Sequence, residues 1–225
     1  YGSRNPTTPE LQTLVATSGD RARATTVEEA LAEGEVVVFA IPGNAMAATV
    51  TQHAAALGGK TVIDTTNLIG PHGASSAVPL LGEQAPQAQV FRAFNSVGFE
   101  NIEQPRYGAV EADMFFCGPD SAARQTVSTL ISEVGFRPIY IGDNSLVYIV
   151  DALAALWLTL VLRRGLGGRL AFKLLWAGEG AGAGGGSSSR LHTFISAAQR
   201  ADRVLLRHPH PPVLRLASHS VLCSV

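Results

Sequence analysis

Polar and small residues follow three apolar segments of the chain, at the points where strands would end. The segment VVVFAI (36–41) runs into Pro42-Gly43-Asn44, TVIDTT (61–66) into Asn67, and QVFRAF (89–94) into Asn95-Ser96. If these segments are neighbouring parallel strands, their carboxyl ends meet at one sheet edge, where open α/β sheets bind ligands. An ordinary strand-to-helix turn explains each sequence taken alone. The three in series favour a common ligand crevice.

The chain opens with Tyr1-Gly2, typical of the end of a strand, followed by Ser3-Arg4-Asn5. In a doubly wound dinucleotide-binding fold the second strand ends at the adenosine ribose, where an acidic residue selects the 2′-hydroxyl. An Arg beside a hydroxyl group instead fits a 2′-phosphate, because its planar donors form charge-assisted hydrogen bonds. Without any ligand, the sequence SRNPTTP is also typical of a turn that leads into a capped helix. On the nucleotide hypothesis, we expect a first strand and a glycine-rich turn before Tyr1, and GEGAGAGGGSSS near the other end does not replace them.

No Ser/His/Asp or Cys/His spacing indicates a nucleophilic or acid–base catalytic set, and no metal-ligand spacing is present. Asp64 and Asp113 lie in apolar strand segments, which favours a structural role in bonding backbone amides. Cys117 is predicted to be a small core residue, and His53 and His72 are predicted to be surface residues of a helix and a loop. Because Cys117 and Cys223 are far apart in the sequence, we expect a reducing compartment and a cytoplasmic protein.

Short apolar runs alternate with alanine-rich stretches of helical length between residues 24 and 142. The runs predict strands over 36–41, 61–66, 89–94, 113–118 and 137–142. The intervening sequence predicts helices, one capped by Thr26 with Glu29 and another ended by Gly135. Strands separated by single helices predict right-handed crossovers, and therefore an α/β fold with a doubly wound, mainly parallel sheet.

The rest of the chain changes character after residue 142. Residues 145–162 are mostly apolar and contain one charged residue, Asp151, and this carboxylate favours a buried or interface helix over a membrane span. The glycine and serine residues after 176 are typical of a linker followed by a loosely ordered extension. We therefore divide the chain into an incomplete nucleotide-binding domain (1–142), a helical segment (143–176) and an extension (177–225). The formal net charge of −1 gives no electrostatic reason to expect nucleic acid or an anionic membrane as a partner.

A set of motifs in the chain resembles the NADP oxidoreductases that depend on a deazaflavin coenzyme. The motifs are GSRNP, ATTVEEAL, VVVFAIP, TVIDTTN, VFRAFNSVGFEN, PRYGAVEADMFFCG and LAALWLTLVLRRGLGGRLAFKLL, in the family's order and over residues 1 to about 175. The resemblance implies a Rossmann-like fold of the kind that pyrroline-5-carboxylate reductases share. It also implies that this chain lacks the fold's first strand and glycine-rich turn.

The resemblance assigns expected roles residue by residue. Ser3, Arg4 and Asn5 match the segment that grips the 2′-phosphate of NADP. Ala40, Ile41 and Pro42 match the turn beside the pyrophosphate and nicotinamide ribose. The residues expected near the nicotinamide are Asn67, Ala93, Asn95 and Ser96, and those expected to wall the second-substrate pocket are Leu153, Leu156 and Trp157.

The function implied by the resemblance is hydride transfer between NADP(H) and a deazaflavin, a flavin or another small acceptor. Such a reaction needs alignment of two rings more than a strong protein acid or base. The 145–162 helix is compatible with a homodimer interface. Two alternatives stay open: a non-catalytic dinucleotide-binding or interaction module, and an inactive, truncated gene product.

Overall fold

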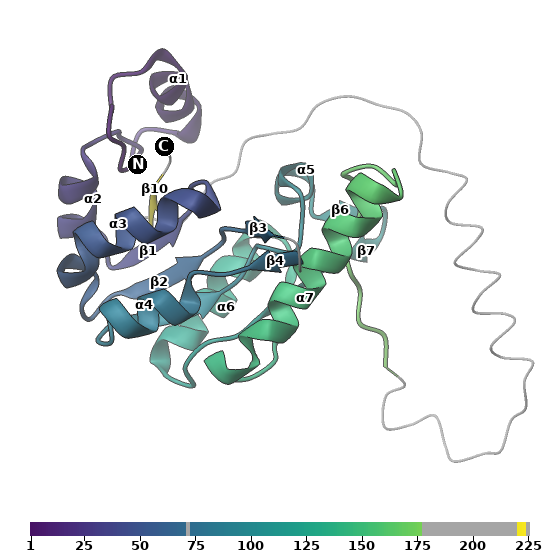
Figure 1. The fold of residues 1–225 in the computed structure, drawn as a ribbon. Helices are drawn as coiled ribbons and strands as arrows, with labels where there is room; N and C mark the ends of the chain where they lie inside the picture. Colours follow the sequence, from purple (N-terminus) through teal and green to yellow (C-terminus); the bar gives the residue numbers. More distant parts are fainter. Residues whose placement is uncertain (71–72, 177–219, 224–225) are drawn as a thin grey trace, which may run out of the picture. The chain divides into compact units, whose positions relative to one another are not determined.

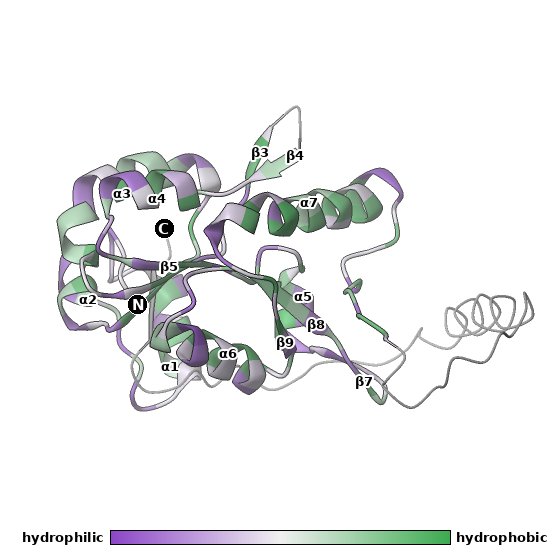
Figure 2. Cartoon of the chain, turned by 90° about the horizontal axis from the view of Figure 1, so that it is seen from below, coloured by the Kyte–Doolittle hydropathy of each residue, from purple (hydrophilic) through white to green (hydrophobic). Residues whose placement is uncertain are grey.

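The computed structural model describes residues 1–70, 73–176 and 220–223. They belong to two compact units, one comprising Tyr1–Lys173 with Val213–Val225 and the other Leu174–Pro212. The fold and the site described below lie in the first unit, and Figures 1 and 2 label most of its helices and strands.

The first unit alternates helices and strands along the chain, as the sequence predicts. The helices are α1 (Pro9–Ser18), α2 (Val27–Glu33), α3 (Met46–His53), α4 (Val78–Gln84), α5 (Phe99–Glu103), α6 (Ala122–Val134) and α7 (Val147–Leu158), with 3-10 turns η1 (Gly43–Ala45), η2 (Ala54–Leu57) and η3 (Asn144–Leu146) and a π-helical turn η4 (Thr159–Arg163). The strands are β1 (Val36–Phe39), β2 (Thr61–Asp64), β3 (Leu68–Gly70), β4 (Gly73–Ser75), β5 (Gln89–Arg92), β6 (Arg106–Tyr107), β7 (Val110–Glu111), β8 (Asp113–Phe116), β9 (Arg137–Tyr140) and β10 (Ser220–Cys223).

The central sheet is parallel and has the strand order β10-β1-β2-β5. A second parallel pair, β8-β9, joins the end of β5 through backbone hydrogen bonds between Arg92 and Cys117 of 2.9 and 3.2 Å. The five predicted strands are confirmed, each ending two residues earlier than predicted. At the amino end, Ser3 N donates to Thr25 O and Thr25 N to Tyr1 O, which pairs the predicted strand end with the segment before α2. The predicted Rossmann-like α/β fold is confirmed.

Alternate residues of each strand enter cores on opposite faces of the sheet. The aligned row Val37, Val62 and Val90 belongs to a core that includes α3 and α4, whereas Ile63 and Phe91 belong to one formed with α6. Figures 1 and 2 show the sheet between these helical layers. A strand that is apolar on both faces is typical of a buried parallel sheet, which explains the continuous apolar runs in the sequence.

Local signals in the sequence set several helix ends. Thr26 and Glu29 form the predicted capping box, and Gly135 ends α6 in the left-handed conformation with φ 107°. The prediction for His53 is wrong, because the residue is 9% exposed at the end of α3. His72 lies outside the described residues. The residues 220–223 of the predicted extension form β10, whose backbone pairs in parallel with β1.

Asp64 has the structural role predicted for it. Its carboxylate accepts hydrogen bonds from Thr66 N (2.9 Å), the Thr66 hydroxyl (2.7 Å) and Ala77 N (2.8 Å). Asp113 instead pairs with the side chains of Arg137 and Lys173, at 2.6 and 2.9 Å. This pairing joins β8 to β9 and to the segment after α7.

The turns after β1 and β2 touch each other through Gly43. A Cβ atom at Gly43 would overlap the backbone carbonyl of Asn67, so only glycine allows this approach. Gly43→Ala should therefore push the two turns apart and lower the free energy of unfolding by about 1–3 kcal/mol, the range for overpacking. Urea denaturation measures this change.

Gly82→Ala is the matched control, because a Cβ at this helical position of α4 meets nothing within 4 Å. It should raise the stability by about 0.5–1 kcal/mol, since alanine favours helix over glycine. Equal effects of the two substitutions would contradict the steric explanation.

Cys117 is fully buried at the end of β8, as predicted. Burial raises the pKa of its thiol to about 12. At pH 8 only about 10⁻⁴ of such a thiol is ionised, and the thiolate is the reactive form. In the Cys223→Ser variant, Cys117 should therefore react with an aromatic disulfide reagent at least about 100-fold more slowly in native protein than in denaturant. Comparable rates in the two conditions would show that Cys117 is accessible.

Candidate functional site

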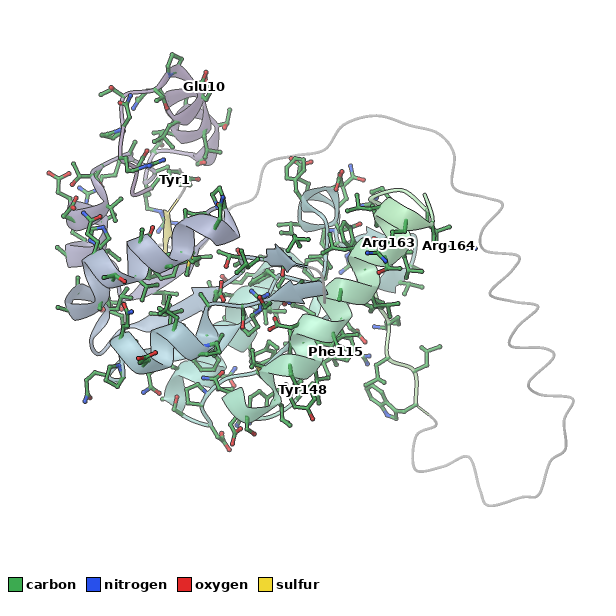
Figure 3. The ribbon with its side chains drawn as sticks, in the orientation of Figure 1. Tyr1, Glu10, Phe115, Tyr148, Arg163 and Arg164 are labelled. Atoms are coloured by element: carbon green, nitrogen blue, oxygen red, sulfur yellow. The ribbon has the colours of Figure 1, made fainter. Side chains whose placement is uncertain are left out.

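Ser3, Arg4 and Asn5 form one wall of a cavity at the amino end of the unit. Its volume is about 400 Å³, and it is lined by Ser3, Arg4, Asn5, Thr8, Glu10, Leu11 and Leu14. The lining therefore comes entirely from the opening segment and α1, where Figure 3 labels Tyr1 and Glu10. The predicted phosphate-binding segment is thus next to a space that can hold a ligand.

The three side chains of this segment are engaged differently. The buried Ser3 hydroxyl accepts a hydrogen bond from Asn5 N (3.2 Å), and Asn5 Oδ1 accepts one from the Thr7 hydroxyl (2.9 Å). The alternative prediction, a turn stabilised by hydrogen bonds of its own side chains, is therefore confirmed for this segment. Arg4 is exposed, and its guanidinium has no hydrogen bond or ion pair within the part of the chain that the structure describes. Arg4 is thus available to an anion, although the Glu10 carboxylate in the same cavity opposes one.

The residues after β1 divide between the surface and the core. Ala40 and Pro42 are exposed, whereas Ile41 is 7% exposed and packs in the core on the α3 and α4 face. Phe39, Asp64 and Arg92 are aligned across β1, β2 and β5. The turns that follow these residues therefore lie at the same edge of the sheet, as predicted.

Asn67 and Asn95 are brought together at this edge. The Asn67 side chain donates from Nδ2 to the Asn95 carbonyl (2.8 Å), and Asn95 donates from its own Nδ2 to the carbonyl of Val150 in α7 (3.2 Å). Asn95 is 3% exposed, and its Oδ1 atom has no hydrogen-bond partner among the residues that the structure describes. A buried acceptor without a partner loses about 1–3 kcal/mol of hydration, so it is a natural place for a ligand donor.

The chain turns sharply between β5 and Asn95. Phe94 has φ 60°, the one positive φ at a residue other than glycine among those the structure describes. Such a conformation costs of order 1 kcal/mol and is common at binding sites. The residues around it, Ala93 and Ser96, are 0% and 1% exposed. Their side chains are therefore enclosed by the protein and are not presented to solvent.

Helix α7 runs along the same edge and packs against β4. Of the predicted pocket residues, Trp157 is buried, Leu153 half-buried and Leu156 46% exposed. Trp157 lies against Gly98, where a Cβ atom would meet its ring, and its Nε1 donates to Leu170 O (2.7 Å). Trp157 thus has the position of a wall beside the segment after β5, and Leu156 belongs to the outer face of the helix.

Two charged residues of this site, Arg92 and Asp151, were not among the predicted site residues. Arg92 Nε donates to Asp151 Oδ1 (2.9 Å), and Arg92 NH2 donates to Asn67 Oδ1 (2.8 Å). Burial raises the pKa of the Asp151 carboxyl, partly offset by the Arg92 guanidinium. The available signal was that each is the only charge in an apolar segment and that the two charges are opposite.

The structure thus contains two groups of predicted site residues. Ser3, Arg4 and Asn5 share the cavity with α1, while Asn67 and Asn95 form a hydrogen-bonded cluster with Arg92 and α7. Within the described residues, no group of three or more His, Cys, Asp or Glu side chains could hold a metal ion. The arrangement can bind and orient a ligand.

Comparison with known proteins supports this interpretation. Residues 2–68 match the family model of NADP oxidoreductases, coenzyme F420-dependent. A candidate F420-dependent NADP-reductase from Arthrobacter sp. FB24 is 25% identical with a TM-score of 0.60, the match covering 68% of this chain and 74% of that one. The hypothetical protein SMa0349 from Sinorhizobium meliloti is 26% identical with a TM-score of 0.54, and the match covers 77% of this chain and 81% of that one.

The comparison with curated proteins finds no match. The match over residues 2–68 includes Ser3, Arg4 and Asn5, the turn after β1 and Asn67, so the predicted family resemblance is confirmed for the part of the site that contains them. With its Rossmann-like sheet and a segment at residues 2–68 that matches the model of coenzyme F420-dependent NADP oxidoreductases, the chain has the features of an NADP-dependent oxidoreductase.

Proposed function

We propose that this protein transfers hydride between NADP(H) and a flat small-molecule acceptor of the deazaflavin or flavin class. The observation that carries the proposal is Arg4, which lies in the segment that matches the family model and lines a cavity. Its guanidinium has no hydrogen bond or ion pair to any described residue. The coenzyme F420 in the name of the Arthrobacter protein supports a deazaflavin as the acceptor.

The residues fit NADP at both of its ends. At the adenosine end, Arg4 offers planar donors to a 2′-phosphate. At the other end, the Oδ1 atom of Asn95 is a buried acceptor that a ligand N–H group would satisfy. Between the two ends of the dinucleotide, Gly43 lets the turns after β1 and β2 approach each other closely, because it has no side chain.

The bound dinucleotide supplies the hydride, and the protein supplies alignment. Arg4 would hold the adenosine end, and the Asn67–Asn95 cluster would fix the segment beside the nicotinamide. Trp157 and Leu153 on α7 would give the acceptor an apolar surface and exclude water from it. The reaction then requires no strong protein acid or base, in keeping with the residues at this edge. We propose a cytoplasmic location for this chemistry.

The role of Arg4 is tested by titrating the protein with NADPH and NADH. Charge-assisted hydrogen bonds contribute about 1.5–3 kcal/mol, so Arg4→Ala should weaken NADPH binding by about 10- to 150-fold and leave NADH unchanged. Arg21→Ala, which removes an exposed arginine outside the cavity, is the control and should change neither affinity.

If the parent protein binds NADPH and NADH equally, or binds neither, the assignment of Arg4 fails. Oxidation of NADPH in the presence of a deazaflavin, a flavin or a ferric acceptor identifies the acceptor class. Binding of NADPH without turnover on any of them would favour the non-catalytic module.

We also propose that α7 forms a homodimer interface. The stretch Asn144–Arg163 is long and apolar enough to span a membrane by length and composition, yet only 11% of its most apolar window is buried. Of the two predicted possibilities, a buried helix is therefore wrong, and an interface helix remains. Tyr148, Leu156 and Leu162 are 64%, 46% and 73% exposed, and Figure 2 shows the helix coloured as hydrophobic along its length. Twofold dimers are the commonest way for a soluble protein to cover such a face.

Charges placed on this face should separate the subunits. Tyr148, labelled in Figure 3, and Leu156 are suitable positions, and the Tyr148→Asp/Leu156→Asp double variant should raise the dimer dissociation constant by at least about 100-fold. Sedimentation velocity over a range of concentrations measures it. Val110→Asp, at an exposed apolar position on β7, is the control. A parent protein that is monomeric at high concentration would contradict the proposal.

A further inference from the structure

Arg92 is the largest side chain that is fully buried in the described part of the chain. It sits at the end of β5 with 0% exposure, although the strand around it is apolar. A buried guanidinium is costly unless every donor is paired. Its partners therefore indicate why the position is an arginine.

Its guanidinium holds three segments together. Nε donates to Asp151 Oδ1 on α7 (2.9 Å), and NH1 donates to the carbonyls of Thr66 and Asp64, the latter at 3.2 Å. NH2 donates to Asn67 Oδ1 (2.8 Å). The Asp64 carboxylate adds a second negative charge 3.4 Å from NH1. The planar fork of arginine suits this set of acceptors, and a lysine ammonium on one stem does not.

The bond to Asn67 determines the orientation of its amide. Because Arg92 NH2 is a donor, it must face Asn67 Oδ1, and Nδ2 is then directed to the Asn95 carbonyl. This sets the spacing between the turns after β2 and β5. The Asn95 amide is set in turn, since its Nδ2 donates to Val150 O, the carbonyl next to Asp151.

Stability alone is a weak explanation of this cluster. A buried ion pair is often no more stabilising than apolar residues of the same volume. The same cluster also contains the positive φ of Phe94 and the Oδ1 atom of Asn95, which has no partner in the described part of the chain, and each of these costs stability. Strain, a buried ion pair and an unsatisfied acceptor at one strand end are typical of a preorganised binding site.

We infer that Arg92 is a positioning residue that holds the Asn95 Oδ1 atom ready for an N–H donor of the ligand, the carboxamide of a nicotinamide ring. Asp151 ties α7, with Trp157, to the same cluster. The inference rests on the proposed function and deepens it: Arg92 acts on the nicotinamide half of the dinucleotide, and Arg4 acts on the adenosine half.

Two ligands separate these halves. NADPH contains both, whereas adenosine 2′,5′-bisphosphate contains the adenosine and its 2′-phosphate without nicotinamide. Calorimetric titration of each ligand is carried out on the parent, Arg92→Lys, Asp151→Asn and Asn95→Ala proteins. Asp120→Asn is the matched control, because it removes the same charge from the exposed pair with Arg124 (3.3 Å).

Arg92→Lys and Asn95→Ala should each weaken NADPH binding at least about 10-fold and change the affinity for the bisphosphate less than about twofold. Asp151→Asn keeps an oxygen acceptor for Arg92 Nε and should have a smaller effect in the same direction. It also serves if Arg92→Lys does not fold, which thermal unfolding of each variant shows. The control should match the parent for both ligands.

Three results would overturn the inference. Equal weakening of both ligands would show that Arg92 only supports the fold, and unchanged NADPH binding would show that it does not position the site. A parent protein that binds the bisphosphate but gains nothing from the nicotinamide half would also exclude it, while leaving the role of Arg4 intact. A parent that binds neither ligand would remove the proposed function itself.

Discussion

The buried charge of Arg92 is the constraint that shapes the ligand edge of this sheet. A guanidinium without water must find oxygen acceptors, and here they come from the turn after β2 and from α7. The positions of Asn67, Asn95 and α7 are therefore coupled through one side chain. The apolar cores on the two faces hold the strands in place, and the hydrogen bonds of Arg92 tie the turn after β2 to the end of β5.

Because Arg92 binds Asp151, the two faces of α7 have different surroundings. Its inner face carries Asp151, Val150 and Trp157, which contact the cluster and the segment after β5. Its outer face carries the exposed apolar side chains of Tyr148 and Leu156, and the exposed Leu162 follows in η4. A second subunit on the outer face would thus be separated from the ligand edge by a single helix. The segment after α7 returns to β8, where Phe172 pairs with Asp113, and this fixes the far end of the helix.

Local signals explain which features could be predicted. The capping box at Thr26, the glycine end of α6 and the strands buried on both faces follow from residues that are close together in the sequence. Ser3, Arg4 and Asn5 were predicted from type and order alone, and the cavity beside them is in keeping with that prediction. The exposure of Leu156 and the burial of His53 could not be predicted from the sequence. Each depends on which distant parts of the chain pack against the helix.

The sequence by itself determined the α/β class, the order of the elements and the set of polar residues at the strand ends. Periodicity, caps and turn residues act over a few positions, so they can be read without coordinates. Only the tertiary structure decided that Arg92 and Asp151, 59 residues apart, form one ion pair and that this pair orients Asn67. The reason is physical: a buried charge is stabilised by whichever acceptors the fold brings to it, and their separation along the chain does not enter into that energy.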